Sequence, residues 1–305
     1  MDRSEIKQLL KMPLAELTAK ADMTRQTAAG STLELCTIMN AKSGMCGEDC
    51  KFCAQSSCHE TNVDTYSLRS KNEMMDAARR AKDMGAQRFG IVTSGNTLTK
   101  EDLHTIIQAV SEIREKIGIA LCGSLGKLNE EDLVSLKRAG LSRYHHNIET
   151  SPDFFAKIVT THTFRDRLDT IRAAKRAGLQ VCSGGIIGMG ETWDDRIDTA
   201  LALKELDVDS VPINILVPVK GIALDSIEAI SCVDAIRTIA IFRMVLKGKT
   251  IKVAAGRESV LKDFQAMAFM SGANGMLIGG YLTVQGRSPE DDRKLIEEIK
   301  AAWQV

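Results

Sequence analysis

The feature that most constrains the fold is an alternation, repeated about eight times along the chain, of a short β-prone run and a longer amphipathic run. This order is typical of a parallel sheet whose strands are joined by helical crossovers. Eight such units in 305 residues fit a closed (β/α)8 TIM barrel of the α/β class better than the competing open, doubly wound sheet. The strands are expected at 33–39, 88–93, 119–122, 143–148, 180–184, 210–216, 251–254 and 276–278. The helices are expected at 74–86, 101–118, 131–140, 165–178, 194–207, 233–248 and 258–272.

The chain is expected to form a single domain over 1–305, because no proline- or serine-rich linker divides it and it contains only five prolines. We expect a helical N-terminal cap over 1–30, the barrel over 31–283 and a C-terminal helix over 284–305. The active site of such a barrel is built at the C-terminal ends of the strands. Side chains that can bind a metal ion or take part in catalysis are therefore expected at these strand ends.

The charge balance excludes several classes of protein. Forty lysines and arginines balance forty aspartates and glutamates, so no basic excess attracts nucleic acid or an acidic membrane surface. The apolar runs are short and interrupted by charge, and residues 1–20 lack the apolar core of a signal peptide. Aromatic residues, at 4%, are too few for a base-stacking platform. We expect a cytoplasmic protein with no nucleic-acid and no membrane partner.

Eight cysteines occur, and four of them crowd into residues 46–58. In a reducing compartment cysteines more often indicate a metal or catalytic site than a disulfide framework. Cys46, Cys50 and Cys53 follow a C-x3-C-x2-C spacing, whose three thiolates suit an iron–sulfur cube with one iron left open for a substrate. The alternative is a zinc site completed by Cys58 or His59, because structural zinc takes four ligands.

An aromatic residue, Phe52, stands between the second and third of these cysteines, as it does beside the cluster of radical S-adenosylmethionine (SAM) enzymes. The cysteine loop and four later blocks resemble that superfamily and, within it, the biotin synthase family. The resemblance runs from about residue 33 to about residue 283, and it implies a barrel with a SAM-bound [4Fe–4S] cluster at its mouth and a second cluster deeper inside. The blocks are CGEDCKFCAQSS (46–57), YHHNIETSP (144–152), VCSGGIIGMGET (181–192), SVPINILVPVKG (210–221), and AAGRE with QAMAFMSGANG (254–258 and 265–275).

The resemblance implies roles for individual residues. Cys46, Cys50 and Cys53 would hold the cluster whose open iron binds SAM, and Arg167 would pair with the methionine carboxylate. Glu149 stands where the family usually has aspartate, and it would accept hydrogen bonds from the ribose. Without the resemblance, Arg167 would be read as an exposed helix arginine. The remaining implied contacts are Phe52 and Ile186 beside SAM, and His145, Asn147 and Asn214 near the substrate, with His145 replacing a family asparagine.

The resemblance also implies an auxiliary cluster, which in most of the family is a [2Fe–2S] cluster held by three single cysteines and one arginine. Cys122, Cys182 and Arg257 match three of these positions. Gly90 stands where the remaining cysteine belongs, and the segment around it contains no cysteine. The usual ligand set is therefore incomplete in this chain.

We expect Cys58 to replace the missing ligand, because thiolates bind iron better than other side chains do. Cys36 is the second choice, since it could face the barrel interior. The alternative for Cys58 is a free surface thiol. The changed ligand set leaves both the [2Fe–2S] and a four-iron type open.

The reaction implied by the resemblance is the insertion of one sulfur atom into dethiobiotin to give biotin, with SAM as the radical source and the auxiliary cluster as the sulfur source. The expected partners are dethiobiotin, an electron donor such as flavodoxin or ferredoxin, and a second copy of the chain in a homodimer. The alternative enzyme is another radical SAM barrel, such as a hydrogenase-maturation or pyrrolysine-pathway enzyme. The non-enzyme alternative is a metal-binding electron carrier, which is disfavoured because such modules are small.

Overall fold

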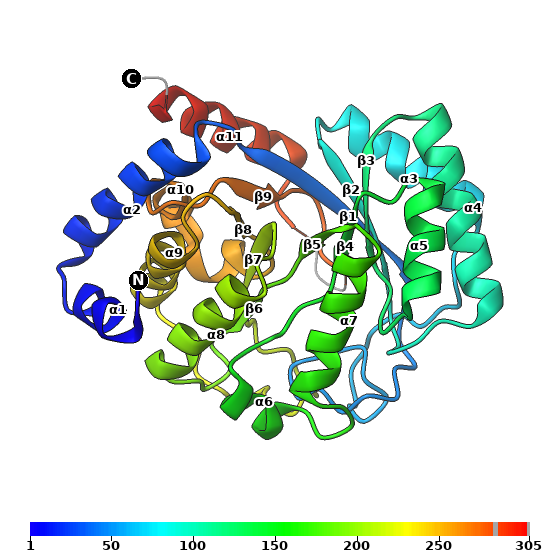
Figure 1. The fold of residues 1–305 in the computed structure, drawn as a ribbon, viewed down its shortest axis with the longest axis horizontal. Helices are drawn as coiled ribbons and strands as arrows, with labels where there is room; N and C mark the ends of the chain where they lie inside the picture. The colour runs from blue at the N-terminus through cyan, green and yellow to red at the C-terminus, as the bar shows by residue number, and fades with distance from the viewer. Residues whose placement is uncertain (283–285, 304–305) are drawn as a thin grey trace.

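The computed structural model describes residues 1–282 and 286–303, and its centre is a ring of parallel strands (Figure 1). The strands are β1 Glu34–Lys42, β2 Arg88–Thr93, β3 Ala120–Ser124, β4 Arg143–His145, β5 Gln180–Cys182, β6 Gly185–Ile187, β7 Ser210–Ile215, β8 Thr250–Val253 and β9 Gly275–Leu277. Their order is β5-β4-β3-β2-β1-β9-β8-β7-β6, and pairing of β5 with β7 closes the ring. Because β5 and β6 are two halves of one strand, the sheet is the (β/α)8 barrel expected from the sequence.

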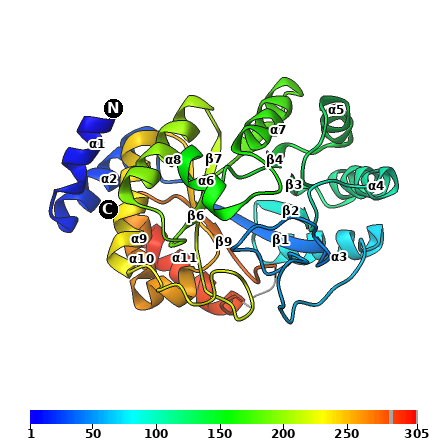
Figure 2. The ribbon, with the colours of Figure 1, turned by 90° about the horizontal axis from the view of Figure 1, so that it is seen from below.

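Helices surround the barrel on its outside, as Figures 1 and 2 show. Most begin at Ser, Thr, Asn or Asp, whose side chain accepts a hydrogen bond from the third helical amide and so satisfies one free N–H group. The helices are α1 Arg3–Leu10, α2 Leu14–Ala29, α3 Lys71–Asp83, α4 Lys100–Lys116, α5 Glu130–Ala139, α6 Pro152–Ile158, α7 Phe164–Arg176, α8 Trp193–Glu205, α9 Cys232–Leu246, α10 Gln265–Met270 and α11 Pro289–Trp303.

The expected strand at 180–184 is interrupted after Cys182 and resumes at Gly185. Close approach to β7 explains the break, because a Cβ added at Gly184 would lie 1.9 Å from the carbonyl oxygen of Pro212. Only glycine fits there. The other strands start and end within a few residues of the expected bounds.

Two helical segments differ from the expectation. The helix expected at 258–272 is broken into a wide turn at 257–261, a tight turn at 262–264 and α10, because Lys262 has a positive φ of 46°. The short helix α6 was not expected, since its seven residues are too few to show a helical period.

The N-terminal cap consists of α1 and α2, which pack on α9. Helix α9 is buried on most of its sides for this reason, with ten of its residues in the interior. At the other end of the chain, α11 lies beside α2, and the guanidinium of Arg25 sits 3.9 Å from the ring centre of Trp303. The expected boundary at 283/284 and the last two residues lie outside the described part of the chain.

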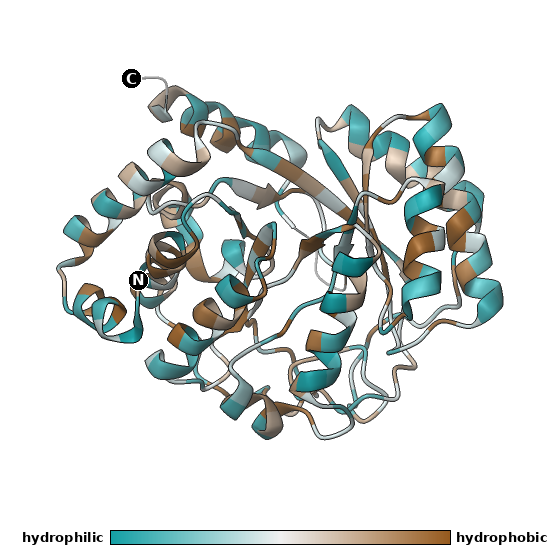
Figure 3. Cartoon of the chain, in the orientation of Figure 1, coloured by the Kyte–Doolittle hydropathy of each residue, from teal (hydrophilic) through white to brown (hydrophobic). Residues whose placement is uncertain are grey.

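The core lies between the strands and the inner faces of the helices, where Ile, Leu, Val and Ala side chains are buried. Hydrophilic residues concentrate on the surrounding helices (Figure 3). Among the residues that the structure describes, no helix is both long enough and apolar enough to cross a membrane. The long connection from β1 to α3 carries the cysteine loop and lies at the end of the barrel where the strands finish (Figure 1).

Candidate active site

A cavity of about 420 Å³ opens among the C-terminal halves of the strands, where the active site of a barrel is expected. Side chains of the strands and of the loops that follow them line it. Most of the residues predicted for the site reach this one space. They are Phe52, Cys53, Cys122, His145, Asn147, Glu149, Cys182, Ile186 and Asn214.

The three cysteines of the C-x3-C-x2-C spacing lie in a loop that closes on itself. The amide of Cys53 donates to the carbonyl oxygen of Cys50 at 2.9 Å, and the amide of Cys46 donates to that of Gln55 at 3.2 Å. Burial raises the pKa of the Cys50 and Cys53 thiols, and the neighbouring Cys46 raises both further. The sulfurs are therefore near enough to act on one another, as the ligands of one shared cluster must be, and iron would keep them deprotonated.

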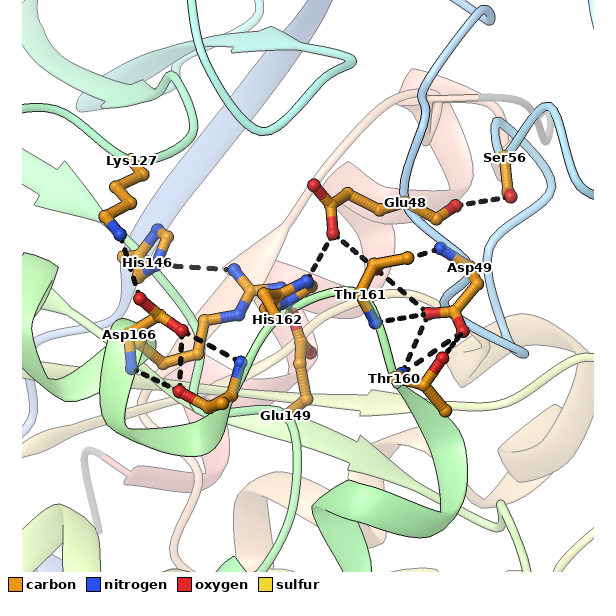
Figure 4. A network of polar contacts seen from close by, with 12 residues as sticks. Glu48, Asp49, Ser56, Lys127, His146, Glu149, Thr160, Thr161, His162 and Asp166 are labelled. Atoms are coloured by element: carbon orange, nitrogen blue, oxygen red, sulfur yellow. Dashed lines mark hydrogen bonds and ion pairs between the residues drawn. The ribbon is translucent and has the colours of Figure 1, made fainter.

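Two acidic residues fasten the cysteine loop to the segment between α6 and α7 (Figure 4). Asp49 accepts hydrogen bonds from the amides of Thr160 at 2.9 Å and Thr161 at 3.2 Å. Glu48 lies 2.6 Å from Nδ1 of His162. Burial raises the pKa of the Asp49 carboxyl, but the hydrogen bonds outweigh burial and hold that pKa well below its usual range. We call these five residues the clamp.

The segment held by the clamp leads directly into α7, which carries Arg167. The Arg167 guanidinium lies 3.6 Å from the Glu149 carboxylate and 3.4 Å from Nε2 of His146. Burial and the Arg167 charge hold the pKa of His146 well below its usual range, so this ring is neutral and can accept a hydrogen bond. Arg167 Nε is buried and has no hydrogen-bond partner among the described residues, which leaves a donor free for an anionic ligand. His146 was missed at the sequence level, because it adjoins His145 and carries no motif of its own.

Glu149 occupies a strained position four residues beyond the end of β4. Its φ is 67°, in the left-handed region that side chains other than glycine, asparagine and aspartate rarely adopt. The carbonyl oxygen of Glu149 accepts a hydrogen bond from the amide of Ile186 at 2.8 Å, and both side chains line the cavity. Strain of this kind concentrates at functional sites, where the surrounding structure holds it in place.

Both predicted asparagines line the cavity while bonding to the backbone. Asn147 Oδ1 accepts from the amide of Gly184 at 3.0 Å, and its Nδ2 lies 3.3 Å from Glu149. Asn214 Oδ1 accepts from the amide of Ala255 at 3.2 Å, and its Nδ2 donates to the Gly185 carbonyl at 3.2 Å. The asparagines therefore tie the ends of neighbouring strands together while lining the cavity.

A second group of cysteines lines the same cavity deeper in the barrel. Cys36, Cys122 and Cys182 come from β1, β3 and β5, and all three are buried. Cys182 pairs in register with His145, four residues before Glu149 along the β4 chain. His145 and Cys182 are the last residues of β4 and β5, so Cys182 lies level with the end of these two strands, whereas Cys36 is the third residue of the longer β1. We call Cys36, Cys122 and Cys182 the floor cysteines.

The floor cysteines differ in acidity. Burial raises the pKa of the Cys182 thiol, but the charges of Lys252 and His145 outweigh burial and lower the pKa to about 6. Burial and the neighbouring Cys182 raise the pKa of Cys122 to about 12. Of these two neighbouring thiols, Cys182 has the lower pKa.

Lys252 was not predicted as a site residue, although it lines the cavity beside these thiols. Its Nζ lies 3.0 Å from Cys36 Sγ and 2.6 Å from the Glu34 carboxylate. The sequence signal is a lone charge between Ile251 and Val253 in an otherwise apolar strand. Because side chains alternate along a strand, Lys252 faces the barrel interior while its two neighbours face the helices.

The structure does not bring Cys58 and Arg257 to the floor cysteines. Cys58 is exposed, lies outside the cavity lining, and donates its amide to Ser56 Oγ at 3.1 Å. Arg257 is fully buried, but its guanidinium bonds to both Asp292 oxygens at 2.7 and 2.8 Å and to Gln265. Arg257 follows the end of β8 in a turn that directs its side chain toward Asp292 of α11.

The zinc alternative finds no support in the described residues. His59 Nδ1 lies 2.8 Å from the Cys53 carbonyl oxygen, and Cys58 is exposed. Within 1–282 and 286–303, no three His, Cys, Asp or Glu side chains converge closely enough to hold one metal ion, which bears on a single zinc ion and not on a cluster whose thiolates each bind a different iron.

Comparison with known proteins identifies the family. Residues 42–203 match the Radical SAM superfamily, and residues 212–301 match the Biotin and Thiamin Synthesis associated domain. The chain is 50% identical to the biotin synthase of Thermotoga petrophila over 297 residues, which cover 97% of this chain and 98% of that protein. The chain belongs to the biotin synthase family. It is also 53% identical to the biotin synthase of Thermotoga neapolitana over 271 residues, 88% of this chain and 97% of that protein.

Membership of the biotin synthase family makes the chain a radical SAM enzyme, a class that uses SAM and a [4Fe–4S] cluster, and it implies an auxiliary cluster as well. The fold is shared more widely. Methylornithine synthase superposes with a TM-score of 0.84 at 18% identity, over 98% of this chain and 92% of that one. HydG, a maturase of the [FeFe]-hydrogenase, gives 0.82 at 17% identity, over 97% and 70% of the two chains. At these identities the likeness shows the fold alone, so the sequence relatives decide between the alternative enzymes.

Proposed function

We propose that this chain converts dethiobiotin to biotin by SAM-dependent sulfur insertion. The observation that carries the proposal is one cavity lined near its opening by Cys53 of the cysteine loop and at its base by the floor cysteines. The biotin synthase relatives that match nearly the whole chain support the same activity. When bound, the two clusters supply the electron that cleaves SAM and the sulfur atom that is inserted.

The cysteine loop is the proposed site of the [4Fe–4S] cluster, with Cys46, Cys50 and Cys53 as its ligands. Its donor set fits, because three thiols crowd one loop that already closes through its own amides. The clamp holds this loop in place without contributing a ligand.

SAM is proposed to bind between the cysteine loop and the end of β4. Arg167, with a free Nε donor, would pair with the methionine carboxylate. Glu149 would accept the ribose hydroxyls, and Phe52 and Ile186 offer the apolar walls of the cavity. In this arrangement Arg167 exchanges part of its contact with Glu149 for contact with the ligand.

The substrate is proposed to bind between SAM and the floor. His145, Asn147 and Asn214 line this stretch, and they offer lone pairs and a donor to the polar ring of dethiobiotin. Cys122 and Cys182 line the same part of the cavity, with Cys182 in register with His145, and both are proposed ligands of the auxiliary cluster. Because the two cysteine groups line one cavity, a substrate bound between them would have its reacting carbon close to both SAM and the auxiliary cluster, and shielded from water.

The chain is proposed to act as one domain over 1–305, because β6 and β7 pair across the boundary between the two family matches. A homodimer and an electron donor such as flavodoxin or ferredoxin are proposed as its partners by family membership.

The test uses anaerobically reconstituted protein with SAM, a low-potential reductant and dethiobiotin. Biotin should appear together with 5′-deoxyadenosine, and omission of dethiobiotin should remove the biotin only. Cleavage of SAM without any biotin would contradict the proposal and favour one of the other radical SAM enzymes.

A further inference from the structure

The floor of the cavity holds a charge imbalance that the protein does not resolve by itself. Lys252, Arg143 and Arg88 surround a single carboxylate, Glu34, at 2.6, 2.6 and 3.9 Å. Arg88 Nε is buried and donates no hydrogen bond to any described residue. Two buried cations and a partly buried third beside one anion are costly unless further negative charge is supplied.

The floor cysteines are the groups that can supply this negative charge. Cys36 Sγ accepts a hydrogen bond from Lys252 at 3.0 Å, and the charges of Lys252 and Arg143 both act on Cys182. Three thiolates wrapped around an iron–sulfur core are anionic overall, whereas three free thiols are not. The cationic surroundings therefore match a bound cluster better than they match an apolar thiol pocket.

Cys36 is also placed to compensate for the cysteine that β2 lacks at Gly90. Gly90 pairs with Ile38 on one side and with Cys122 on the other. A Cβ at Gly90 would lie 3.0 Å from Ile38 Cγ2, so a side chain there is crowded. Cys36 lies two residues before Ile38 on the same face of β1, where it reaches the cavity one layer deeper.

We propose that Cys36, Cys122 and Cys182 hold the auxiliary iron–sulfur cluster, with Lys252 beside it. This inference rests on the proposed function, which requires such a cluster, but it concerns the ligands alone. It replaces Cys58 and Arg257 in the set expected from the sequence. The ligands then come from β1, β3 and β5, so strands of the barrel would hold the cluster, and no ligand would come from a surface loop.

The first test compares three serine variants, Cys36→Ser, Cys58→Ser and Cys232→Ser, after identical anaerobic reconstitution. Iron and sulfide per chain and the Mössbauer spectrum are measured together with 5′-deoxyadenosine formation. Cys36→Ser should keep about four irons of the SAM-binding cluster and still cleave SAM, but lose the iron of the second cluster. The other two variants should keep the wild-type iron content. Full iron in Cys36→Ser, or loss of the second cluster in Cys58→Ser, would overturn the assignment.

A second test needs no variant and therefore survives a folding defect in Cys36→Ser. Wild-type protein is treated with methyl methanethiosulfonate before and after removal of iron with a chelator, and each cysteine is scored by mass spectrometry. The three floor cysteines should be protected only while iron is bound, and Cys58 should react in both states. Equal labelling of Cys36 in both states would refute its role.

The proposed function and the ligand assignment can be disproved separately. If wild-type protein binds only about four irons and makes no biotin, the proposed function is wrong whatever Cys36 does. If wild-type protein holds a second cluster and makes biotin while Cys36 stays reactive, only the ligand assignment is wrong.

Discussion

The two cysteine groups of this barrel are built in opposite ways. The loop group lies within eight residues of sequence, 46–53, and a few side-chain hydrogen bonds of the clamp hold it on the neighbouring segment. The floor group is spread over 36–182 and is brought together only by the register of the parallel strands. The floor group thus depends on the register of three separate strands, and a one-residue shift of any of them would turn its cysteine away from the cavity.

The largest expected effect separates the two groups by SAM cleavage. Replacing Cys46, Cys50 or Cys53 by alanine should abolish 5′-deoxyadenosine formation, because each removes a ligand of the SAM-binding cluster. Cys36→Ser should leave that reaction in place. Deoxyadenosine formation by all three loop variants would break the comparison and the assignment of the radical cluster with it.

A smaller effect probes the charged floor through folding stability. Burial raises the pKa of the Glu34 carboxyl, but Lys252 and Arg143 outweigh burial and lower it to about 2 from 4.5. A lowered carboxyl pKa stabilises the folded state above the unfolded value, and that contribution is lost as pH falls from about 4.5 to about 2. Glu34→Gln should therefore lower the free energy of unfolding of the metal-free protein by up to about 3 kcal/mol near pH 7.

Urea denaturation at pH 7 and at pH 3 measures this difference, which should shrink at the lower pH. Glu297→Gln, on the exposed face of α11, is the matched control and should change little at either pH. Equal midpoints for the wild type and Glu34→Gln at pH 7 would show that the floor charges are not coupled as described.

The next effect lies at the mouth of the cavity. Arg167→Ala should weaken SAM binding by about 1.5–3 kcal/mol, because it removes a charge-assisted hydrogen bond. Isothermal titration with cluster-loaded protein should show Kd raised about tenfold to a hundredfold. Arg172→Ala, an exposed arginine of the same helix, serves as the control. Unchanged affinity in the Arg167 variant would remove this residue from the SAM site.

The smallest expected effect concerns the clamp. Asp49→Asn keeps the side-chain size but removes the charge that the Thr160 and Thr161 amides stabilise, at a cost of about 1 kcal/mol. The loop should open more often, so a chelator should remove the loop iron severalfold faster. Asp64→Asn, at an exposed position, is the control. Equal iron release from both variants would mean that the clamp does not hold the loop.

The same contrast explains what could be predicted from the sequence. The strand–helix alternation gave the barrel and most element bounds, because both depend on local periodicity. The spacing that singled out Cys46, Cys50 and Cys53 is local in the same way, because all three lie within one loop.

The residues that line the base of the cavity could not be predicted from local spacing. Arg257 and Lys252 are five residues apart, and only the three-dimensional path of β8 and the following turn decides that Lys252 faces the cavity while Arg257 faces Asp292. Cys58 was favoured over Cys36 for its nearness in sequence to the loop cysteines, yet closure of the sheet brings Cys36 into the same cavity as Cys122 and Cys182. Distances across a barrel follow from register, which a single sequence does not contain.

The contact between Gly90 and Ile38 makes the order of substitutions matter for anyone who redesigns this barrel. A cysteine introduced at Gly90 places its Cβ 3.0 Å from Ile38 Cγ2, so Ile38 must move by a few tenths of an ångström to admit it. Trimming Ile38 to alanine removes this contact and leaves space that the new side chain can fill. The two positions are therefore expected to be coupled, and a screen at Gly90 is better run with Ile38 varied at the same time.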